Sequence, residues 1–256
     1  MRFSSCRFLG AVLAAVVVSS AGASHAACSL QLGWELYEPF QMKNSDGKIG
    51  GIDVDLFSEA AKQAGCAVTL KEVPWKRLLI DIEGGKMDAA MGASITAERQ
   101  AFGHFSESYR KDEFVLFVRK GEASKVEATG IASLVGKPFR LGIVGGYEYG
   151  ESFDALKKPL GKQVDEAAST ELNLRKLASS RIDGLLENNF VGLALARKEN
   201  LSDKIEIHPT PISSDVVSFM FSKKSVDPAV VTGINDALKA MRADGRYDQI
   251  LARYLK

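Results

Sequence analysis

The sequence predicts an α/β protein with two lobes, each built on an open, doubly wound sheet. Segments with strand character alternate with segments of helical periodicity, as in "SLQLGW", "GIDVDLFSEAAKQAG" and "AVTLKEV". The alternation restarts after residue 120, with "FRLGIVGG" followed by "EYGESFDALKK". Two such series indicate two lobes. No low-complexity linker separates the series, so we expect strands at 113–120 and 211–220 to join the lobes.

Local periodicity predicts each element of the first series. The segment at 51–65 repeats apolar residues at helical spacing and ends in Gly65, which is typical of a helix C-terminus. "WKRLLIDIEGG" predicts a second short helix, and "MDAAMGA" predicts a short buried strand. Thr96 is expected to begin a third helix, "TAERQAFG", as its N-cap. The residues of 113–120 are strong β-formers.

The second series is predicted in the same way. Strands are expected in "FRLGIVGG", "QVDEAAS", "IDGLLEN", "IEIHPTPI" and "VVSFMFSK". Helices are expected in "EYGESFDALKK", "TELNLRKLASSR" and "NFVGLALARKE". The apolar positions of the second of these helices are Leu172, Leu174 and Leu177. The C-terminal stretch predicts two amphipathic helices that are broken at Asp244 and Gly245.

The N-terminal stretch has the features of a secretory signal peptide. Two arginines precede an apolar run over 8–18, which is too short to span a membrane. Ser24 and Ala26 lie at the −3 and −1 positions of a cleavage site. A buried N-terminal helix and a lipoprotein acylated at Cys28 are the alternatives. We interpret residues 1–26 as a signal peptide and expect a soluble, exported mature chain.

Composition and charge exclude several classes of function. The formal net charge is +1, and charged residues make up 25% of the chain. A chain this close to neutral lacks the bulk field that attracts nucleic acid or an acidic membrane, so neither partner is expected. With three cysteines and three histidines, the chain has no zinc-type ligand cluster, and it has no GxGxxG fingerprint. We therefore expect no metal and no cofactor.

Cys28 and Cys66 are the cysteines that remain after cleavage of the signal peptide. Each lies at the start of a predicted strand, and the helix between the two strands makes them parallel. Neighbouring strands lie ~4.8 Å apart, which is within reach of a disulfide. In an exported protein we expect this disulfide, and the chain-entropy model gives it ~3–4 kcal/mol. Two free buried thiols are the alternative.

The stretch "MGASITAER" (91–99) is the clearest candidate site. It follows a predicted strand, where open α/β sheets bind their ligands. Gly92 allows close backbone approach, Ser94 adds a hydroxyl group, and Thr96 begins a helix whose N–H groups favour an anion. Arg99 can present a bidentate fork to a carboxylate. The loop therefore suits a small carboxylate, and the alternative is a capped helix with a surface arginine.

The chain resembles the family-3 periplasmic solute-binding proteins, the polar amino-acid receptors of ABC importers. The likeness rests on "YEPF" (37–40), "GGIDVDLFSEAAKQAG" (50–65), "GGKMDAAMGASITAERQAFGHFSESY" (84–109), "RIDGLLEN" (181–188) and "ALKAMRADGRYDQILARYL" (237–255). The resemblance implies the type 2 periplasmic binding-protein fold, in which two lobes joined by two strand crossovers close on a ligand. It places lobe 1 at 27–113 plus 217–256 and lobe 2 at 114–216. It also implies a periplasmic monomer and an ABC permease as partner.

The resemblance assigns roles to individual residues of the first lobe. Gly92, Ser94 and Arg99 match the positions that bind the ligand's α-carboxylate, and Thr96 matches a neighbouring cap. Tyr37 and Trp75 match the aromatic pair that sandwiches the ligand side chain. Without the resemblance, the sequence predicts Tyr37 as a surface loop residue and Trp75 as a residue packed in the core.

The second lobe departs from the family pattern. Family amino-acid binders have an aspartate for the α-ammonium where this chain has Asn188, with Glu187 before it. An asparagine accepts a hydrogen bond but does not neutralise an ammonium. Tyr147 stands where the family usually has a threonine, and Trp34 stands where an aspartate can receive basic side chains. We nevertheless keep Tyr147, Glu187 and Asn188 as candidate ligand contacts, and we count Trp34 against lysine or arginine as ligand.

These observations predict an exported protein that binds a small carboxylate-bearing solute, foremost an amino acid or a derivative, for an ABC importer. One alternative is an enzyme of the same fold, similar to cyclohexadienyl dehydratases, with Glu187 or Glu148 as a general acid. Another is a ligand-sensing partner of a membrane receptor. An enzyme consumes its ligand, whereas a binding protein returns it unchanged.

Overall fold

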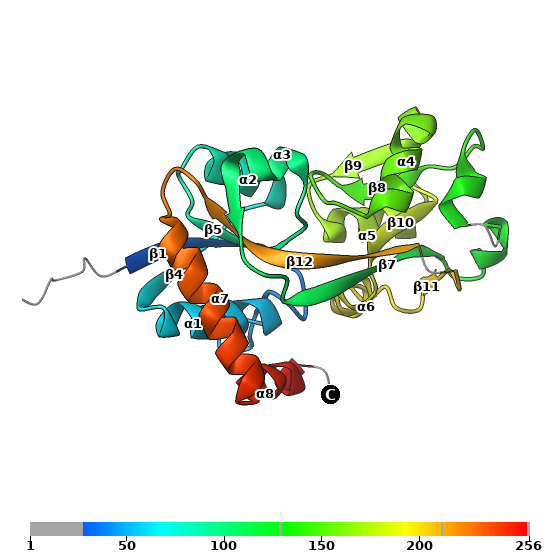
Figure 1. The fold of residues 1–256 in the computed structure, drawn as a ribbon. Coiled ribbons are helices and arrows are strands. Elements are labelled where there is room, and N and C mark those ends of the chain that lie inside the picture. The colour runs from blue at the N-terminus through cyan, green and yellow to red at the C-terminus, as the bar shows by residue number, and fades with distance from the viewer. Residues whose placement is uncertain (1–27, 128–129, 211, 255–256) are drawn as a thin grey trace, which may run out of the picture.

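The computed structural model describes residues 28–127, 130–210 and 212–254, and the expected signal peptide lies outside them. The strands are β1 (Cys28–Trp34), β2 (Met42–Lys43), β3 (Ile49–Gly50), β4 (Cys66–Glu72), β5 (Ala89–Ala93), β6 (Gly103–Phe105), β7 (Arg110–Arg119), β8 (Leu141–Val144), β9 (Val164–Ala167), β10 (Gly184–Asn188), β11 (Ile205–Ile207) and β12 (Ser213–Ser222). All but β2 and β3 form one curled sheet in the order β4-β1-β5-β12-β7-β10-β8-β9, with β6 beside β12 and β11 beside β7 (Figure 1).

Helices cover both faces of this sheet. They are α1 (Ile52–Gln63), α2 (Trp75–Glu83), α3 (Ala97–Phe102), α4 (Glu151–Leu160), α5 (Thr170–Ala178), α6 (Asn189–Lys198), α7 (Pro228–Ala243) and α8 (Arg246–Tyr254), with 3₁₀ turns at Ala123–Lys125, Gly130–Leu134 and Gly161–Gln163. In Figure 1, α1 and α8 lie below the strands β4, β1 and β5, α7 runs diagonally downward across them, and α2 and α3 lie above them. The alternating order of strands and helices agrees with the predicted α/β class.

The prediction of two separate sheets needs correction, because the strands form one continuous sheet. Strand β12 pairs with β5 and β6 through 218–222 and with β7 through 213–217. A ten-residue strand is long enough to join both sets of neighbours, with a register shift between Ser218 and Met220 in its pairing with β5. We call β4, β1, β5 and β6 with their helices the first half, and β10, β8, β9 and β11 with theirs the second half. The two long strands, β7 and β12, connect the halves.

Most helices begin and end where their sequences predict. Helix α1 buries the apolar positions of its 3.6-residue repeat, and Gly65 follows its end with φ +76°. Thr96 caps α3 by accepting the N–H of Arg99 at 3.1 Å. Of the three leucines of α5, Leu174 and Leu177 are buried, whereas Leu172 is 44% exposed. Leu172 lies two positions before Leu174, and two positions rotate a helix by about 200°, so the two side chains face opposite ways.

The first half has a continuous apolar core and a covalent tie between two strands. Phe57 packs edge-on and Tyr109 packs face-on against Phe219, with ring centroids 5.0 and 4.1 Å from that of Phe219. Cys28 and Cys66 are directly opposite each other in the parallel pair β1–β4 and form the expected disulfide. The bond closes a separation of 38 residues and holds the start of the sheet.

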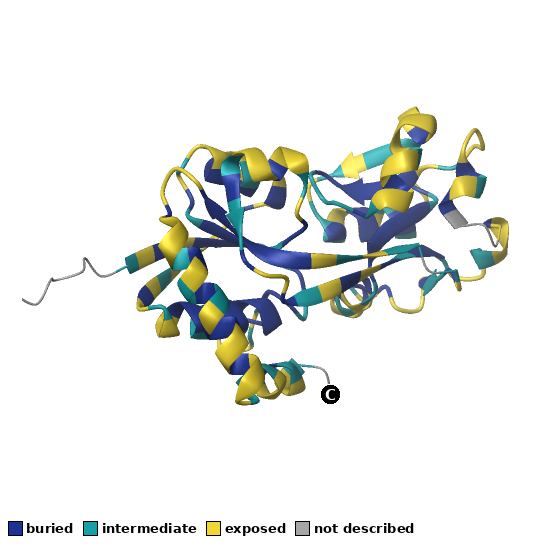
Figure 2. Cartoon of the chain, in the orientation of Figure 1, coloured by how far each residue is buried: buried dark blue, intermediate teal, exposed yellow. Residues whose placement is uncertain are grey.

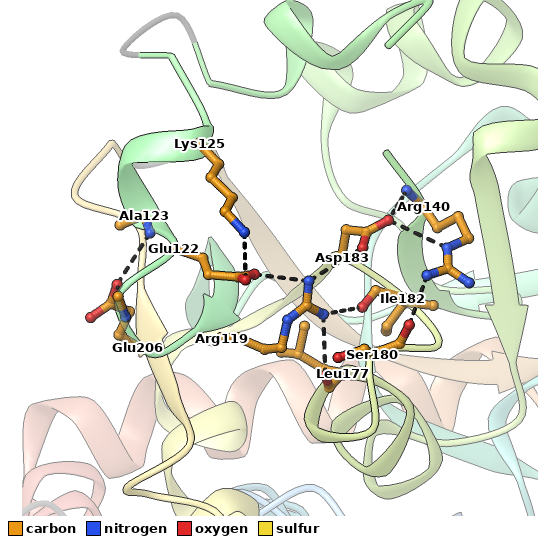
Figure 3. Close-up of polar contacts among 11 residues, drawn as sticks. Arg119, Glu122, Ala123, Lys125, Arg140, Leu177, Ser180, Ile182, Asp183 and Glu206 are labelled. Atoms are coloured by element: carbon orange, nitrogen blue, oxygen red, sulfur yellow. Dashed lines mark hydrogen bonds and ion pairs between the residues drawn. The ribbon is translucent and has the colours of Figure 1, made fainter. Parts of the chain in front are cut away.

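A charged cluster ties the segment after β7 to the second half (Figure 3). Arg119 donates to the carbonyl of Ile182 at 2.6 Å and contacts the carboxylates of Glu122 at 2.8 Å and Asp183 at 3.3 Å. Asp183 also accepts the N–H of Arg140 at 2.9 Å. Because each charge meets an opposite charge or a carbonyl within the cluster, we assign it a structural role.

Burial follows the strands. Figure 2 shows buried residues along the middle of the sheet and helices that are exposed on their outer faces. Among the described residues, no helix is long and apolar enough to cross a membrane. The same residues contain no group of three or more histidine, cysteine, aspartate or glutamate side chains placed to hold a metal ion.

Candidate functional site

A cavity lies between the two halves, beside the carboxyl ends of β1 and β5. Its empty volume is about 390 Å³, part of it open to solvent. This is the position at which open α/β sheets bind ligands. Six of the predicted site residues line it: Tyr37, Trp75, Gly92, Ser94, Arg99 and Tyr147.

Arg99 is the buried cation of this cavity. Its side chain is 5% exposed, and Nη1 donates to the carbonyl of Ser94 at 3.0 Å. Nη2 donates to the carbonyl of Gly146, in the second half, at 2.8 Å and lies 3.5 Å from the carboxylate of Glu148. Burial lowers the pKa of Arg99, although the charge of Glu148 opposes that shift. Because a guanidinium has five N–H donors and two are used on carbonyls, Arg99 retains donors for a ligand carboxylate.

Gly92 shapes the floor of the cavity. Its φ is +69°, a conformation that favours glycine, and its N–H donates to the hydroxyl of Tyr109 at 2.9 Å. A Cβ atom at this position would lie 3.1 Å from Nη2 of Arg110 and 3.6 Å from Oδ2 of Asp53. Any larger residue would therefore strain the backbone and crowd a buried ion pair.

Three aromatic side chains form the walls. Tyr147 lies edge-on to Tyr37, with ring centroids 5.8 Å apart, and edge-on to Trp75, at 6.2 Å. The indole N–H of Trp75 donates to the carbonyl of Gly146 at 2.8 Å, the same oxygen that Arg99 contacts. The hydroxyl of Tyr147 donates to the carboxylate of Glu35. The walls of the cavity are thus held by contacts between the first and second halves.

Three predicted site residues lie outside the cavity lining. Thr96 caps α3, as described above. Glu187 is fully buried in β10 and accepts the hydroxyl of Thr170 and the backbone N–H of Asn188. The Oδ1 atom of Asn188 caps α6, because it accepts the N–H groups of Phe190 and Val191 at 2.9 and 3.3 Å. The chain turns from strand to helix at this point, and the side-chain oxygens of both residues already accept hydrogen bonds there.

The cavity also contains residues that the sequence analysis did not place there: Glu35, Gln41, Met91, Asp112, Phe114 and Glu148. Of these six, the sequence analysis names only Glu148, as the general acid of the alternative enzyme. Glu35 directly follows β1, and a side chain at the carboxyl end of a strand is a detectable signal. The sequence analysis did not identify Asp112, because β7 begins at Arg110, three positions before the start of the predicted strand at 113–120.

A second buried arginine, Arg110, lies under the cavity. It donates to both oxygens of Asp53, at 2.7 and 2.9 Å, and to Oδ1 of Asp112. Its guanidinium also lies 3.8 Å from the ring centroid of Phe40. Burial lowers the pKa of Arg110, but the charges of Asp112 and Asp53 more than offset it and hold that pKa well above its usual value. Burial raises the pKa of Asp112, whereas Arg110 opposes that rise.

Three further acids near the cavity have raised pKa values. Burial raises the pKa of Glu35 to about 7, against hydrogen bonds from Tyr147 and from the backbone of Trp75. Burial also raises the pKa of Glu187 to about 8 and, in the same direction, that of Glu148. Near neutral pH the cavity therefore holds one carboxyl group, that of Glu35, that a bound charge or a change of pH can titrate.

Comparison with known proteins agrees with this architecture. Residues 30–256 match the bacterial extracellular solute-binding proteins, family 3. A probable histidine-binding protein of Neisseria gonorrhoeae is 27% identical over 219 residues, 85% of this chain and 79% of the relative. The histidine-binding periplasmic protein of Escherichia coli strain K12 is 26% identical over 243 residues, 92% of each chain. An ancestral arginine-binding protein bound to glutamine superposes with a TM-score of 0.76 at 28% identity, over 90% of this chain and 99% of that chain. The chain therefore belongs to family 3 of the bacterial extracellular solute-binding proteins.

Proposed function

We propose that this protein is an exported binding protein that captures a small carboxylate-bearing solute, an amino acid or a close derivative, and delivers it to an ABC importer. The observation that carries the proposal is the environment of Arg99. This guanidinium is buried in the cavity, its hydrogen bonds go to uncharged carbonyls, and donors remain for a ligand. The relatives, which are named for histidine and arginine, support an amino acid as the solute.

Different residues of the cavity lining contact different parts of the ligand. Arg99 receives the carboxylate of the ligand through its fork, because two parallel N–H···O bonds match a carboxylate. The hydroxyl of Ser94 adds a donor on the same side. Tyr37 and Trp75 offer apolar ring surface to the rest of the ligand. Tyr147 lies between these two rings and limits how large that part of the ligand can be.

The family fold supports a closing motion of two lobes, 27–113 plus 217–256 and 114–216. Strands β7 and β12 would then act as the hinge. Across the boundary, Arg99 and Trp75 bind Gly146, and Lys76 contacts Glu166 at 2.7 Å. Closure brings these groups together around the ligand, so binding shifts the population toward the closed form. We propose that a membrane permease recognises the closed form. The periplasmic relatives and the N-terminal signal pattern support the periplasm as the location.

A dehydratase-like enzyme is the second candidate, and one observation favours it. Glu35 lines the cavity with a pKa of about 7, which suits a general acid at neutral pH. Incubating the protein with a bound ligand and recovering that ligand by mass spectrometry separates the candidates. Unchanged ligand supports the binding protein, whereas a dehydrated product supports the enzyme.

The experiment for the main proposal is a thermal unfolding screen. The mature protein is unfolded and refolded to remove any bound solute, then mixed with the twenty L-amino acids and a set of organic acids. A ligand at ~100 times its Kd adds ~2.7 kcal/mol of stability, which raises Tm by several degrees. Arg99→Ala is expected to abolish the shift.

Arg253→Ala is the matched control, since Arg253 lies on α8, is exposed and pairs only with Asp55 among the described residues. If Arg99→Ala binds the ligand as tightly as the native protein does, the assignment of the carboxylate site is wrong.

A further inference from the structure

We infer that Asp112, positioned by Arg110 and Asn188, receives the positively charged amino group of the ligand. The site is then built for a zwitterion, with Arg99 for the carboxylate and Asp112 for the ammonium. The inference rests on the proposed function, since it assumes that the cavity binds a carboxylate at Arg99. Asn188 stands where the family has an aspartate for the ammonium group, and Asp112 supplies a negative charge for that group from another position in the cavity.

The geometry leaves one oxygen of Asp112 available. Asp112 lies on β7, is 3% exposed and lines the cavity. Both of its hydrogen bonds are made by Oδ1, which accepts Nη1 of Arg110 and, at 2.6 Å, Nδ2 of Asn188. Within the part of the chain that the structure describes, Oδ2 accepts no hydrogen bond. Asp112 therefore has a fixed orientation and a free acceptor.

The buried charges around Asp112 do not balance. Arg110 carries one positive charge and is shared by two aspartates, because Asp53 binds it through both oxygens. The three side chains together carry one excess negative charge at exposures of 5% or less. An unpaired buried charge is costly. A ligand cation at Oδ2 would complete the pairing without any rearrangement of the three side chains.

Asn188 cannot serve as the cation acceptor, because its side chain has a fixed direction. Oδ1 is occupied by the N–H groups that begin α6, so Nδ2, the donor end, faces Asp112. A carboxylate at position 188 would place a second negative charge against Oδ1 of Asp112. The amide of Asn188 thus holds the carboxylate of Asp112 in position, and the acidic group of the site lies on β7 instead of at position 188.

The other two acids of the cavity are less suited to this role. Both oxygens of Glu35 already accept hydrogen bonds, one from the hydroxyl of Tyr147 and one from the N–H of Trp75 at 2.8 Å. Glu148 lies 3.5 Å from the guanidinium of Arg99, at the carboxylate end of the cavity. Asp112 is the cavity acid that combines an unused oxygen with an unbalanced charge.

The test compares each amino acid with the same molecule lacking the amino group. All twenty L-amino acids are first screened for binding. Calorimetry then measures the affinity of the refolded native protein for L-histidine, L-arginine and L-glutamine. The same measurement is made with the corresponding desamino acids, which are imidazolepropionic, 5-guanidinopentanoic and glutaramic acid. We expect the amino acid that binds best to bind at least tenfold more tightly than its desamino acid. This comparison needs no variant, so it holds even if a substitution disturbs folding.

Three variants then locate the effect. Asp112→Asn is expected to lower affinity for the amino acid at least tenfold and to change affinity for the desamino acid less than threefold. Asn188→Asp is expected to weaken amino-acid binding, although it adds the acidic group that Asn188 lacks. Glu113→Gln is the control, since Glu113 is the next residue of β7, is exposed and lies outside the cavity lining.

The outcomes separate this inference from the proposed function. If desamino acids bind the native protein as tightly as amino acids do, and Arg99→Ala abolishes both, the carboxylate site stands and the role of Asp112 is refuted. The same conclusion follows if Asn188→Asp binds the amino acid more tightly than the native protein. If neither ligand class binds, both proposals fail.

Discussion

Arg99 and Arg110 are both buried at the junction of the two halves, but their partners differ in kind. Arg110 is held by the carboxylates of Asp53 and Asp112 and stacks on Phe40. Arg99 is held by two backbone carbonyls, and the carboxylate of Glu148 lies 3.5 Å from its Nη2 atom. The difference teaches that a buried arginine saturated by acids serves the structure. A buried arginine held by neutral groups keeps its charge for a ligand.

The largest effect that tests this comparison is expected from Arg110→Met. The substitution leaves Asp53 and Asp112 without their partner, and breaking a buried pair in this way costs ~3–5 kcal/mol. Arg99→Met leaves two carbonyls and the partly exposed carboxylate of Glu148 without this partner, and the two carbonyls cost ~1–3 kcal/mol. Urea denaturation of both variants, without ligand, measures the free energies of unfolding. Equal losses would show that Arg99 is also a structural arginine.

Glu187→Gln tests a buried acid whose hydrogen bonds, among the described residues, come from Thr170 and Asn188 and not from an arginine. Because its pKa rises from 4.5 to about 8 on folding, the unfolded chain loses this proton at lower pH than the folded protein. The native protein therefore loses stability as pH rises from about 5 to 8, with a slope of up to ~1.4 kcal/mol per pH unit from this one group. The glutamine variant is expected to show a shallower decline, since it has no proton to release.

Thermal unfolding at several pH values measures that decline, and the exposed Glu113→Gln is the control. A decline that is identical in the native protein and in Glu187→Gln would mean that Glu187 is ionised in the folded protein. Glu35, whose pKa is raised to about 7, contributes to the decline that remains in Glu187→Gln, as do Asp112 and Glu148, whose pKa values burial also raises.

Glu148→Gln is expected to have the smallest effect. Glu148 is the carboxylate that competes with a ligand for Arg99, and its side chain is 29% exposed. Its removal should raise affinity for the carboxylate ligand about twofold, which corresponds to ~0.4 kcal/mol, within the range of partly exposed ion pairs. Calorimetry at low and high salt measures it. A fall of more than threefold in affinity would instead show that Glu148 contacts the ligand directly.

The sequence predicted the parts of the site that depend on near neighbours. Thr96 caps α3, and Gly92, Ser94 and Arg99 lie together, because a strand, a loop and a helix start follow one another within nine residues. It did not indicate that Oδ1 of Asn188 caps α6 while Nδ2 donates to Asp112. Strand β10 ends there and α6 begins, and the helix N–H groups attract the amide oxygen.

The sequence by itself determined the alternation of strands and helices, the pairing of Cys28 with Cys66, and the break between α7 and α8. These features follow from hydrophobic period, turn residues and chain order, which are local properties. Only the tertiary structure decided that one sheet joins both halves, that Glu35 enters the cavity, and that Asp112 shares Arg110 with Asp53. Asp53 and Arg110 lie 57 positions apart, and their contact depends on strand register and on burial that no local pattern encodes.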